Sequence, residues 1–174
     1  MRSPHEGKGS DMACRGVHFA ITGEQAETLI AAKDDEELMS LLESIEETWD
    51  VANLAESDKA WDAMHRCLTD GTLGRGNGVY PLSHCVLGPR QLHEGDEYIV
   101  SLVLPNEVRD VAKALQVATP EWFGEKYATV LPRDYAPVYG QEDLDYTWSN
   151  LEDVRRLFEK ASEAGRAVVF TVDQ

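Results

Sequence analysis

The sequence predicts an α+β fold, in which a small central sheet of about three strands is packed by about six to seven helices. Three segments have the apolar character of strands, at residues 13–22, 97–105 and 166–172. Segments with helical periodicity lie between them. No tight hairpin signal and no regular repeat of βα units is present, which favours one compact α+β domain.

The domain is expected to span residues 12–174, preceded by a disordered extension at residues 1–11. The extension is polar and contains a proline and two glycines, so it cannot bury enough surface to stay ordered. The whole chain is 43% hydrophobic and 28% charged, as is typical of a soluble globular protein. At 174 residues it can form a core without a disulfide or a metal.

In the first strand, at residues 13–22, apolar side chains alternate with other residues. Val17, Phe19 and Ile21 lie on one face of this strand. Gly16 precedes them and marks a bulge or a close approach of the backbone.

Two helices are expected next, each with a capping signal. Thr22 is followed three residues later by Gln25, and Asp34 in the same way by Glu37. The first helix runs to about Ala32. The second carries a single apolar stripe made of Leu38, Leu41, Leu42, Ile45 and Trp49.

A further helix carries the segment "SDKAWDAMHRCLTDG" and is capped by Ser57 or Asp58. It ends near the glycines at 71–78. The segment "PLSHCVLG" predicts a short helix, with Pro81 at its first position and Gly88 as its terminator.

The strand at 97–105 is nearly continuous in apolar residues, which predicts that both of its faces are covered. The remaining expected elements are a helix from Pro105 or Asn106, a helix from Pro120, a loop at 132–141, a long amphipathic helix ending at Gly165 and the strand at 166–172.

The charge of the chain is strongly acidic. Sixteen basic residues against 32 acidic ones give a formal charge of −16, which repels nucleic acid and anionic membranes and attracts basic proteins. Nine acidic residues lie between Glu24 and Glu47, where Lys33 is the one basic residue. We expect a negative helical face, which is either simply solvated or a docking surface for a basic partner. Its candidate partner-binding residues are Glu36, Glu37, Glu43, Glu46 and Glu47.

The cysteines and the hydropathy pattern favour a cytoplasmic location. Cys14, Cys67 and Cys85 form neither an even framework nor a CxxC pair, as expected of free thiols in a reducing compartment. No apolar run approaches the ~20 residues that span a bilayer. The N-terminus lacks the apolar core of a signal peptide.

The helix at 57–71 brings an aromatic, a carboxylate and an imidazole together. Trp61 and His65 share one face, and Asp62 beside them faces both His65 and Arg66. A carboxylate against an imidazole is the arrangement of an oriented general base. The competing interpretation is structural, with an ordinary Asp62–Arg66 ion pair and a histidine bonded to a neighbouring loop. The candidate pocket residues are Trp61, Asp62, His65, Arg75 and His84.

Metal, cofactor and nucleophile chemistry is not indicated. His65 and Cys67 point about 200° apart on a helix, and no zinc spacing is present. Acidic surroundings raise a thiol pKa, which disfavours Cys67 as a nucleophile. The segment "GTLGRGNG" follows a helix and supplies only Arg75, so it is not a phosphate-binding loop. It is expected to be a flexible loop that ends the helix, with the option of a lid beside His65.

The residues quoted so far resemble the bacterial YfbM-like family, the domain of unknown function 1877, over roughly residues 12–173. The matching positions are Lys59, Trp61, Asp62, His65, Leu68 and Thr69, then Pro81, Leu82, Val86, Leu87 and Gly88, and the closing segment "LFEKASEAGRAVVFTV". The resemblance implies the α+β fold. It implies no activity, because the family has no assigned catalytic residues.

Three functions therefore stay open. The first is a binding or interaction module without catalytic turnover, for example an antidote for a basic partner. The second is a small-ligand-binding protein or enzyme with its pocket around Trp61, Asp62, His65 and the loop at 71–88. The third is an architectural or oligomeric role in which the tryptophan-bearing helix specifies the fold.

Overall fold

The computed structural model describes residues 14–130 and 140–173. Its strands are β1 (Gly16–Ile21), β2 (Leu54–Asp58), β3 (Tyr98–Val103) and β4 (Ala167–Asp173). Its helices are α2 (Gly23–Ile30), α3 (Asp35–Thr48), α4 (Trp61–Leu68), α5 (Pro105–Gln116), α6 (Pro120–Val130) and α7 (Gln141–Ala164), with 3-10 turns η1 (Val51–Asn53) and η2 (Leu82–His84). The predicted extension at 1–11 and most of the predicted loop at 132–141 lie outside the described residues.

The sheet has the strand order β2-β1-β4-β3, and all its pairings are antiparallel. The α+β class is confirmed, but the expected number of strands is wrong, because β2 is a fourth strand. Its sequence, "LAESD", contains no β-branched or aromatic residue. It forms a strand because it pairs with the otherwise free edge of β1, with Ala55 and Ser57 buried. Tertiary pairing here overrides local propensity.

Because β2 extends to Asp58, the next helix begins later than predicted. Asp58 ends β2 instead of capping a helix, and α4 begins at Trp61 with Ala60 at the N-cap. The short helix expected from Pro81 is reduced to the turn η2.

The bulge predicted at Gly16 is present, since the register of β1 against β2 shifts between Gly16 and Val17. A Cβ at Gly16 would lie 2.7 Å from the Phe170 ring and 2.9 Å from the hydroxyl of Ser57. Only glycine therefore fits where the bulged strand meets its neighbours.

The other sheet edge is covered by a segment that carries no hairpin signal. The N–H of Leu92 donates to the carbonyl of Val100 (2.9 Å), and the N–H of Leu102 donates to that of Arg90 (3.0 Å). This pairing lies along β3, whose residues 99–103 are buried, as the continuous apolar run predicted.

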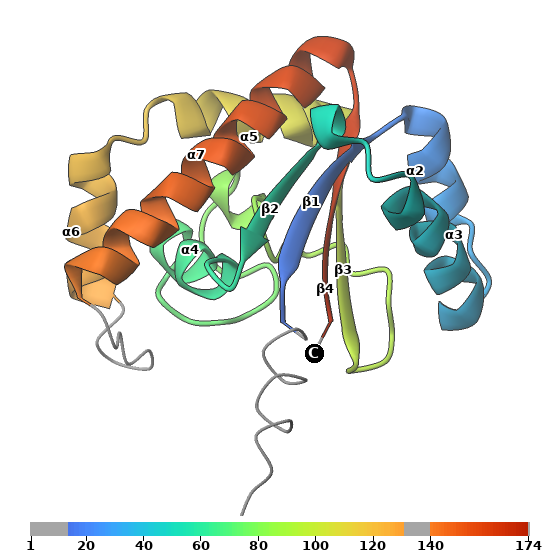
Figure 1. The fold of residues 1–174 in the computed structure, drawn as a ribbon, viewed down its shortest axis with the longest axis horizontal. Coiled ribbons are helices and arrows are strands. Elements are labelled where there is room, and N and C mark those ends of the chain that lie inside the picture. Colours follow the sequence, from blue (N-terminus) through green and yellow to red (C-terminus); the bar gives the residue numbers. More distant parts are fainter. Residues whose placement is uncertain (1–13, 131–139, 174) are drawn as a thin grey trace, which may run out of the picture.

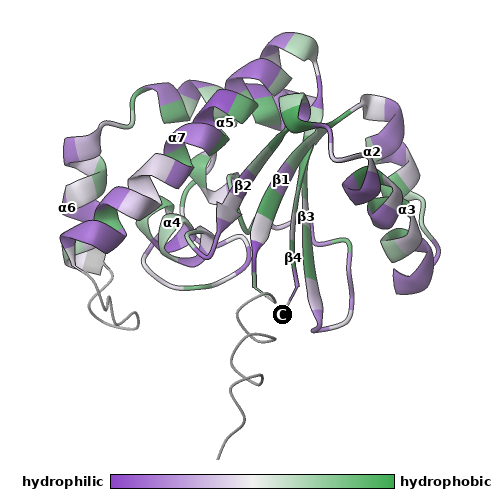
Figure 2. Cartoon of the chain, viewed as in Figure 1, coloured by the Kyte–Doolittle hydropathy of each residue, from purple (hydrophilic) through white to green (hydrophobic). Residues whose placement is uncertain are grey.

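Helices cover both faces of the sheet (Figure 1). Helices α4, α5, α6 and α7 lie on one face and α2 and α3 on the other. Figure 2 shows apolar residues concentrated in the strands and polar residues along the outer surface of α3. Two hydrophobic cores result. The larger one includes Phe158 and Phe170, and the smaller one includes Phe19, Leu38 and Val169.

The predicted caps that enclose the smaller layer are confirmed. Thr22 and Gln25 form a complete capping box at α2. The carboxylate of Asp34 accepts a bond from the N–H of Glu37 at the start of α3. At the other end of the chain, Gly165 ends α7 with φ +66. No helix among the described residues combines the length and apolarity that a membrane crossing requires.

Candidate functional site

Trp61, the aromatic residue of the predicted motif, belongs to the larger core. Its side chain is 5% exposed, and its ring lies 6.0 Å from that of Phe170. The indole N–H donates a hydrogen bond of 2.8 Å to the carbonyl of Cys14. This bond connects α4 to the residues that precede β1.

His65 is fully buried, with 0% of its surface exposed. Its Nε2 lies 2.7 Å from Oδ1 of Asn77, and the N–H of Leu87 donates to its Nδ1 at 3.4 Å. An acceptor at Nδ1 leaves Nε2 as the protonated nitrogen, which donates to Asn77. Burial lowers the pKa of His65, so the ring is neutral near pH 7. Both nitrogens are thus used in bonds that position neighbouring chain segments.

Asn77 organises the glycine-rich loop that follows α4. Its amide Nδ2 donates to Oγ1 of Thr69 (3.1 Å), to Oδ1 of Asp70 (2.6 Å) and to the carbonyl of Thr72 (3.1 Å). Bonds from the Thr72 hydroxyl and from Asn77 lower the pKa of Asp70 to about 2. The sequence contained no signal for this role, since Asn77 lies 12 positions from His65 in a loop without periodicity.

The backbone holds the same loop against the protein. The N–H of Gly76 donates to the carbonyl of Leu87 at 2.8 Å. Gly78 has φ +87, and a Cβ there would lie 2.7 Å from Thr69. A loop bonded in this way is fixed beside α4.

The other predicted pocket residues have different partners. Asp62 pairs with Arg66 at 2.7 Å, the ordinary i,i+4 ion pair that was the structural alternative. Arg75 is exposed. His84 lies 3.4 Å from the carboxylate of Glu107 on α5. Geometry therefore joins His65 to Asn77, which sequence reasoning missed, whereas His84 contacts another helix.

His84 is part of a series of side chains with the composition of a catalytic triad. The Oγ of Ser83 lies 3.1 Å from Nδ1 of His84, and Glu107 lies on the opposite side of the ring. A nucleophile must reach its substrate, yet Ser83 is buried. Glu107 is itself bonded to Arg90 at 2.6 Å. This arrangement anchors η2 to α5.

Reactive chemistry at Cys67 or Cys85 and metal binding find no geometric support among residues 14–130 and 140–173. Burial raises the pKa of Cys67 and of Cys85 to about 12, so neither is a thiolate near pH 7. Nowhere in these ranges do three or more histidine, cysteine or acidic side chains converge in a way that could hold a metal ion.

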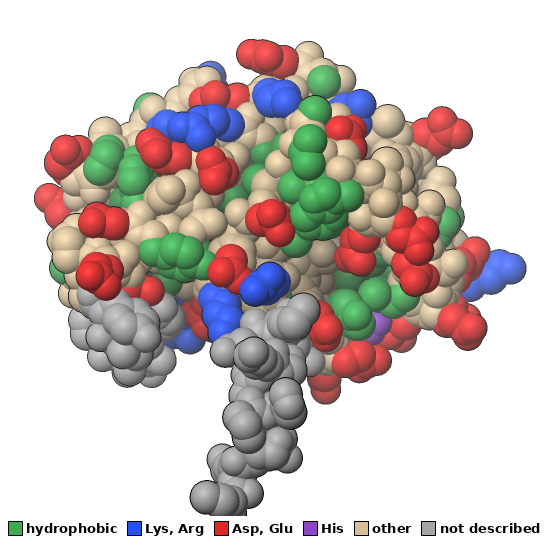
Figure 3. Space-filling model, in the orientation of Figure 1, with side chains coloured by type: hydrophobic (Ala, Val, Ile, Leu, Met, Phe, Trp, Pro, Cys, Tyr) green, Lys and Arg blue, Asp and Glu red, His purple; other side chains and the backbone are tan. Residues whose placement is uncertain are grey.

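The acidic residues of α3 fall into two groups. Glu36 and Glu37 lie in the first turn, where carboxylates favour the helix dipole. Glu37 also accepts the N–H of Lys33 at 2.7 Å. The second group, which we term the α3 acidic end, comprises Glu43, Glu46 and Glu47 of α3 with Asp173 of β4. In the space-filling view, acidic side chains outnumber basic ones over the side formed by α2 and α3 (Figure 3).

Three carboxylates of the α3 acidic end, those of Glu43, Glu46 and Asp173, are close enough to repel one another. Partial burial, followed by the charges of Glu43 and Asp173, raises the pKa of Glu46. The pKa of Tyr98 is also raised, by burial and then by Asp173, Glu46 and Glu43. Within the described part of the chain, no lysine or arginine forms an ion pair with these carboxylates.

Trp49 follows directly after the last turn of α3. It adopts the left-handed conformation, with φ 42 and ψ 56, which glycine usually occupies at this position. The ring packs edge-on against Phe19, with centroids 6.0 Å apart, and 40% of the residue remains exposed. A large aromatic surface is thus held in place next to the acidic end.

Comparisons with known proteins agree with this architecture. The structure is similar to the crystal structure of YfbM from Escherichia coli, described as a protein of unknown function. The two are 18% identical with a TM-score of 0.56, and the match covers 91% of this chain and 99% of that one. At this identity the likeness establishes the fold alone. A search of curated proteins found no match.

The sequence itself matches a family model. The model, described as a domain of unknown function (DUF1877), covers residues 12–171. The match includes all of the helices α2–α7 and the tryptophan-bearing motif on α4 from which the resemblance was inferred. The chain belongs to this YfbM-like family, DUF1877.

Proposed function

We propose that the chain is a protein-binding module without catalytic turnover, which binds a basic partner through the α3 acidic end. The last turn of α3 carries the proposal. It contains Glu46 and Glu47 and no basic residue. The carbonyl groups at a helix C-terminus carry a partial negative charge and favour cations nearby. The carboxylates of Glu46 and Glu47 therefore lie where they contribute least to the stability of the free protein.

Mutual repulsion supports a role in binding. A raised pKa at Glu46 means that its ionised form is disfavoured in the folded protein. Lysine or arginine side chains of a partner would relieve the repulsion from Glu43 and Asp173. Complementary charge of this kind accelerates association and selects partners.

Trp49 adds an apolar component to the same surface. Exposed tryptophan next to carboxylates can stack on a guanidinium or an ammonium group. Tryptophan is also enriched among the residues that dominate binding energy at protein interfaces. The left-handed backbone of Trp49 is a conformation that a side chain occupies at a cost, and such residues cluster at functional sites.

The geometry gives less support to a pocket at the motif helix. A reactive imidazole needs access to a substrate, whereas His65 has none of its surface exposed and both of its nitrogens bonded. We place this module in the reducing cytoplasm, because Cys14, Cys67 and Cys85 are all free thiols, as is usual for proteins of that compartment.

The test compares two variants with the same net charge. One carries Glu→Gln at positions 43, 46 and 47, and the control carries Glu→Gln at positions 24, 27 and 36. All six residues lie on α2 or α3. Proteins captured from an extract of the source cells by the wild type and by each variant are identified. The affinity of each captured protein is then measured by calorimetry at two salt concentrations.

We expect a basic protein that binds the wild type and the control but loses at least about tenfold in affinity for the variant at 43, 46 and 47. Its affinity for the wild type should fall with added salt. Trp49→Ala should weaken the same complex. Equal affinity for both triple variants would show that the acidic end is not the binding surface.

A further inference from the structure

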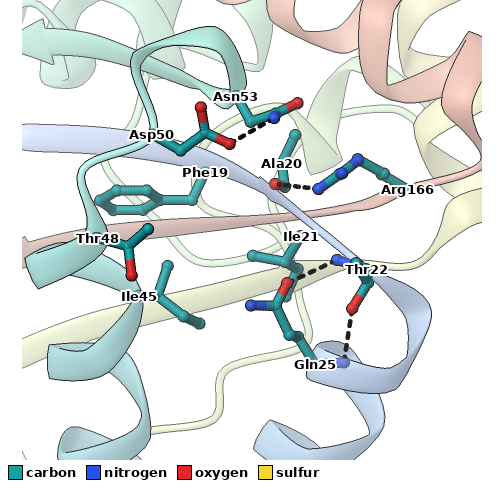
Figure 4. Close-up of a pocket in the computed structure, with 10 residues that line it drawn as sticks. All are labelled: Phe19, Ala20, Ile21, Thr22, Gln25, Ile45, Thr48, Asp50, Asn53 and Arg166. Atoms are coloured by element: carbon teal, nitrogen blue, oxygen red, sulfur yellow. Dashed lines mark hydrogen bonds between the residues drawn. The ribbon is translucent and has the colours of Figure 1, made fainter.

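A hollow of about 410 Å³ lies between the end of β1 and the helices α2 and α3 (Figure 4). It is separate from the α3 acidic end and from the motif helix, since none of their residues lines it. The chain segments that form it are far apart in sequence, from Phe19 at one extreme to Arg166 at the other. Its size is in the range of small-molecule sites.

Two opposite charges face this hollow. Arg166 follows the end of α7, and its Nη1 donates to the carbonyl of Ala20 at 3.3 Å. Asp50 follows α3, and its carboxylate accepts bonds from the side chain of Asn53 (2.7 Å) and from the N–H of Ala52 (3.2 Å). Neither set of bonds joins the two charges to each other, and Figure 4 shows both side chains on the wall of the hollow.

The two charges are nonetheless near enough to interact. The pKa of Asp50 is lowered, first by the bond from Asn53 and to a smaller extent by the charge of Arg166. The guanidinium has five N–H donors in a planar fork, of which the bond to Ala20 uses one. It can therefore bind a carboxylate through two parallel bonds while it keeps its place.

The rest of the wall combines apolar and uncharged polar groups. Phe19, Ile21 and Ile45 supply the apolar part. The polar part consists of Thr22, Gln25, Thr48 and Asn53. A few converging polar groups around an apolar surface are the usual composition of a site for a small organic ligand.

We propose that this hollow binds a small zwitterion with an apolar side chain, of the size of an α-amino acid. Arg166 binds the carboxylate and Asp50 binds the ammonium group. The aliphatic part of the ligand lies against Ile45 and its apolar neighbours. The site does not depend on the proposed basic partner.

The test uses three closely related probes: leucine, 4-methylpentanoate and leucinamide. Binding of each to the full chain is measured by calorimetry and by the rise in melting temperature. 4-Methylpentanoate has the carbon skeleton of leucine without the ammonium group, and leucinamide has a neutral amide in place of the carboxylate. We expect saturable binding of leucine and at least about tenfold weaker binding of each of the other two, because each loses one charge-assisted contact.

Variants locate the binding. Arg166→Gln and Asp50→Asn should each weaken the binding of leucine at least about tenfold. Arg109→Gln, which changes an exposed arginine on α5, should leave the affinity for leucine unchanged. Circular dichroism confirms that each variant is folded. The proposal is overturned if no binding is detected at ~10 mM leucine, a concentration well above the range in which proteins usually bind metabolites. It is also overturned if leucine binds the Arg166→Gln variant as tightly as the wild type.

Discussion

The ring of His65 donates a hydrogen bond of 2.7 Å to the side-chain amide of Asn77, and through it α4 holds the loop that follows. The Nδ2 of the same amide donates hydrogen bonds to the side chains of Thr69 and Asp70. Histidine here acts as a buried, neutral connector. The glycine-rich segment consequently has a defined shape.

Replacing Asn77 with alanine should lower the free energy of unfolding by about 2 kcal/mol, because the buried N–H of His65 would lose its acceptor. The measurement is urea unfolding at pH 7. Asn106→Ala is the matched control, since Asn106 is exposed on α5, and it should change stability by less than about 0.5 kcal/mol. Equal effects of both substitutions would contradict the connecting role of Asn77.

Trp61→Ala should destabilise the protein by about 3–5 kcal/mol, since it removes a large side chain from the larger core. Trp61→Phe keeps most of the packing but loses the indole N–H that bonds to Cys14, which should reduce stability by only about 1 kcal/mol beyond the lost volume. Denaturant unfolding of both variants measures the two contributions. A phenylalanine variant as unstable as the alanine variant would contradict this division.

His18 should make stability fall in mild acid. It is completely buried, its Nε2–H donates to the carbonyl of Cys85 (2.8 Å), and burial lowers its pKa to about 4. The unfolded chain takes up this proton near pH 6.5, whereas the folded protein does so only near pH 4. Since the unfolded state binds more protons in that interval, stability is complete above pH 6.5 and is lost as the pH falls.

His18→Gln isolates this contribution, because the glutamine amide can still donate to Cys85 but does not titrate. Between pH 7 and pH 4 the variant should lose about 3 kcal/mol less stability than the wild type. Other titrating groups are common to both proteins. Parallel stability curves over this range would show that His18 is not responsible.

Glu46→Gln should raise the melting temperature at pH 7. The variant removes the repulsion from Glu43 and Asp173 and keeps an acceptor for the hydroxyl of Thr171, which bonds to Glu46. The expected gain is roughly 0.5 kcal/mol, because the site is partly exposed and screened. Because the pKa of Glu46 is raised, the folded wild type also loses stability as the pH rises through that pKa, and the variant should not.

The control for this prediction is a glutamate whose carboxylate is favourable at its position in the helix. Glu36 lies in the first turn of α3, where a carboxylate is favourable, so Glu36→Gln should leave stability unchanged or lower it. Differential scanning calorimetry in low and high salt measures both variants. The difference between them should shrink as salt screens the charges. If both variants gain equally, total charge and not position accounts for the effect.

Local signals in the sequence were sufficient for most helices. The capping residues Thr22 and Asp34 and the terminating Gly165 act through neighbours only a few positions away, so spacing alone identified them. The bulge at Gly16 could also be predicted, because a glycine weakens the interior of a strand and is therefore typical of places where the strand bulges or another segment approaches closely.

Features that depend on distant contacts could not be predicted in this way. β2 is a strand because β1 lies beside it, and its own residues have weak strand preference. Asn77 meets His65 only after the loop has turned back on α4. For the same reason Asp50 and Arg166, which lie far apart in the sequence, could not be assigned to one hollow.

The layer formed by α2 and α3 is one continuous segment of the chain, since both helices and η1 follow β1 and precede β2. It has its own hydrophobic core on its own face of the sheet. Side chains on the outer surface of α2 and α3 can therefore be substituted without disturbing the larger core, which lies on the opposite face of the sheet.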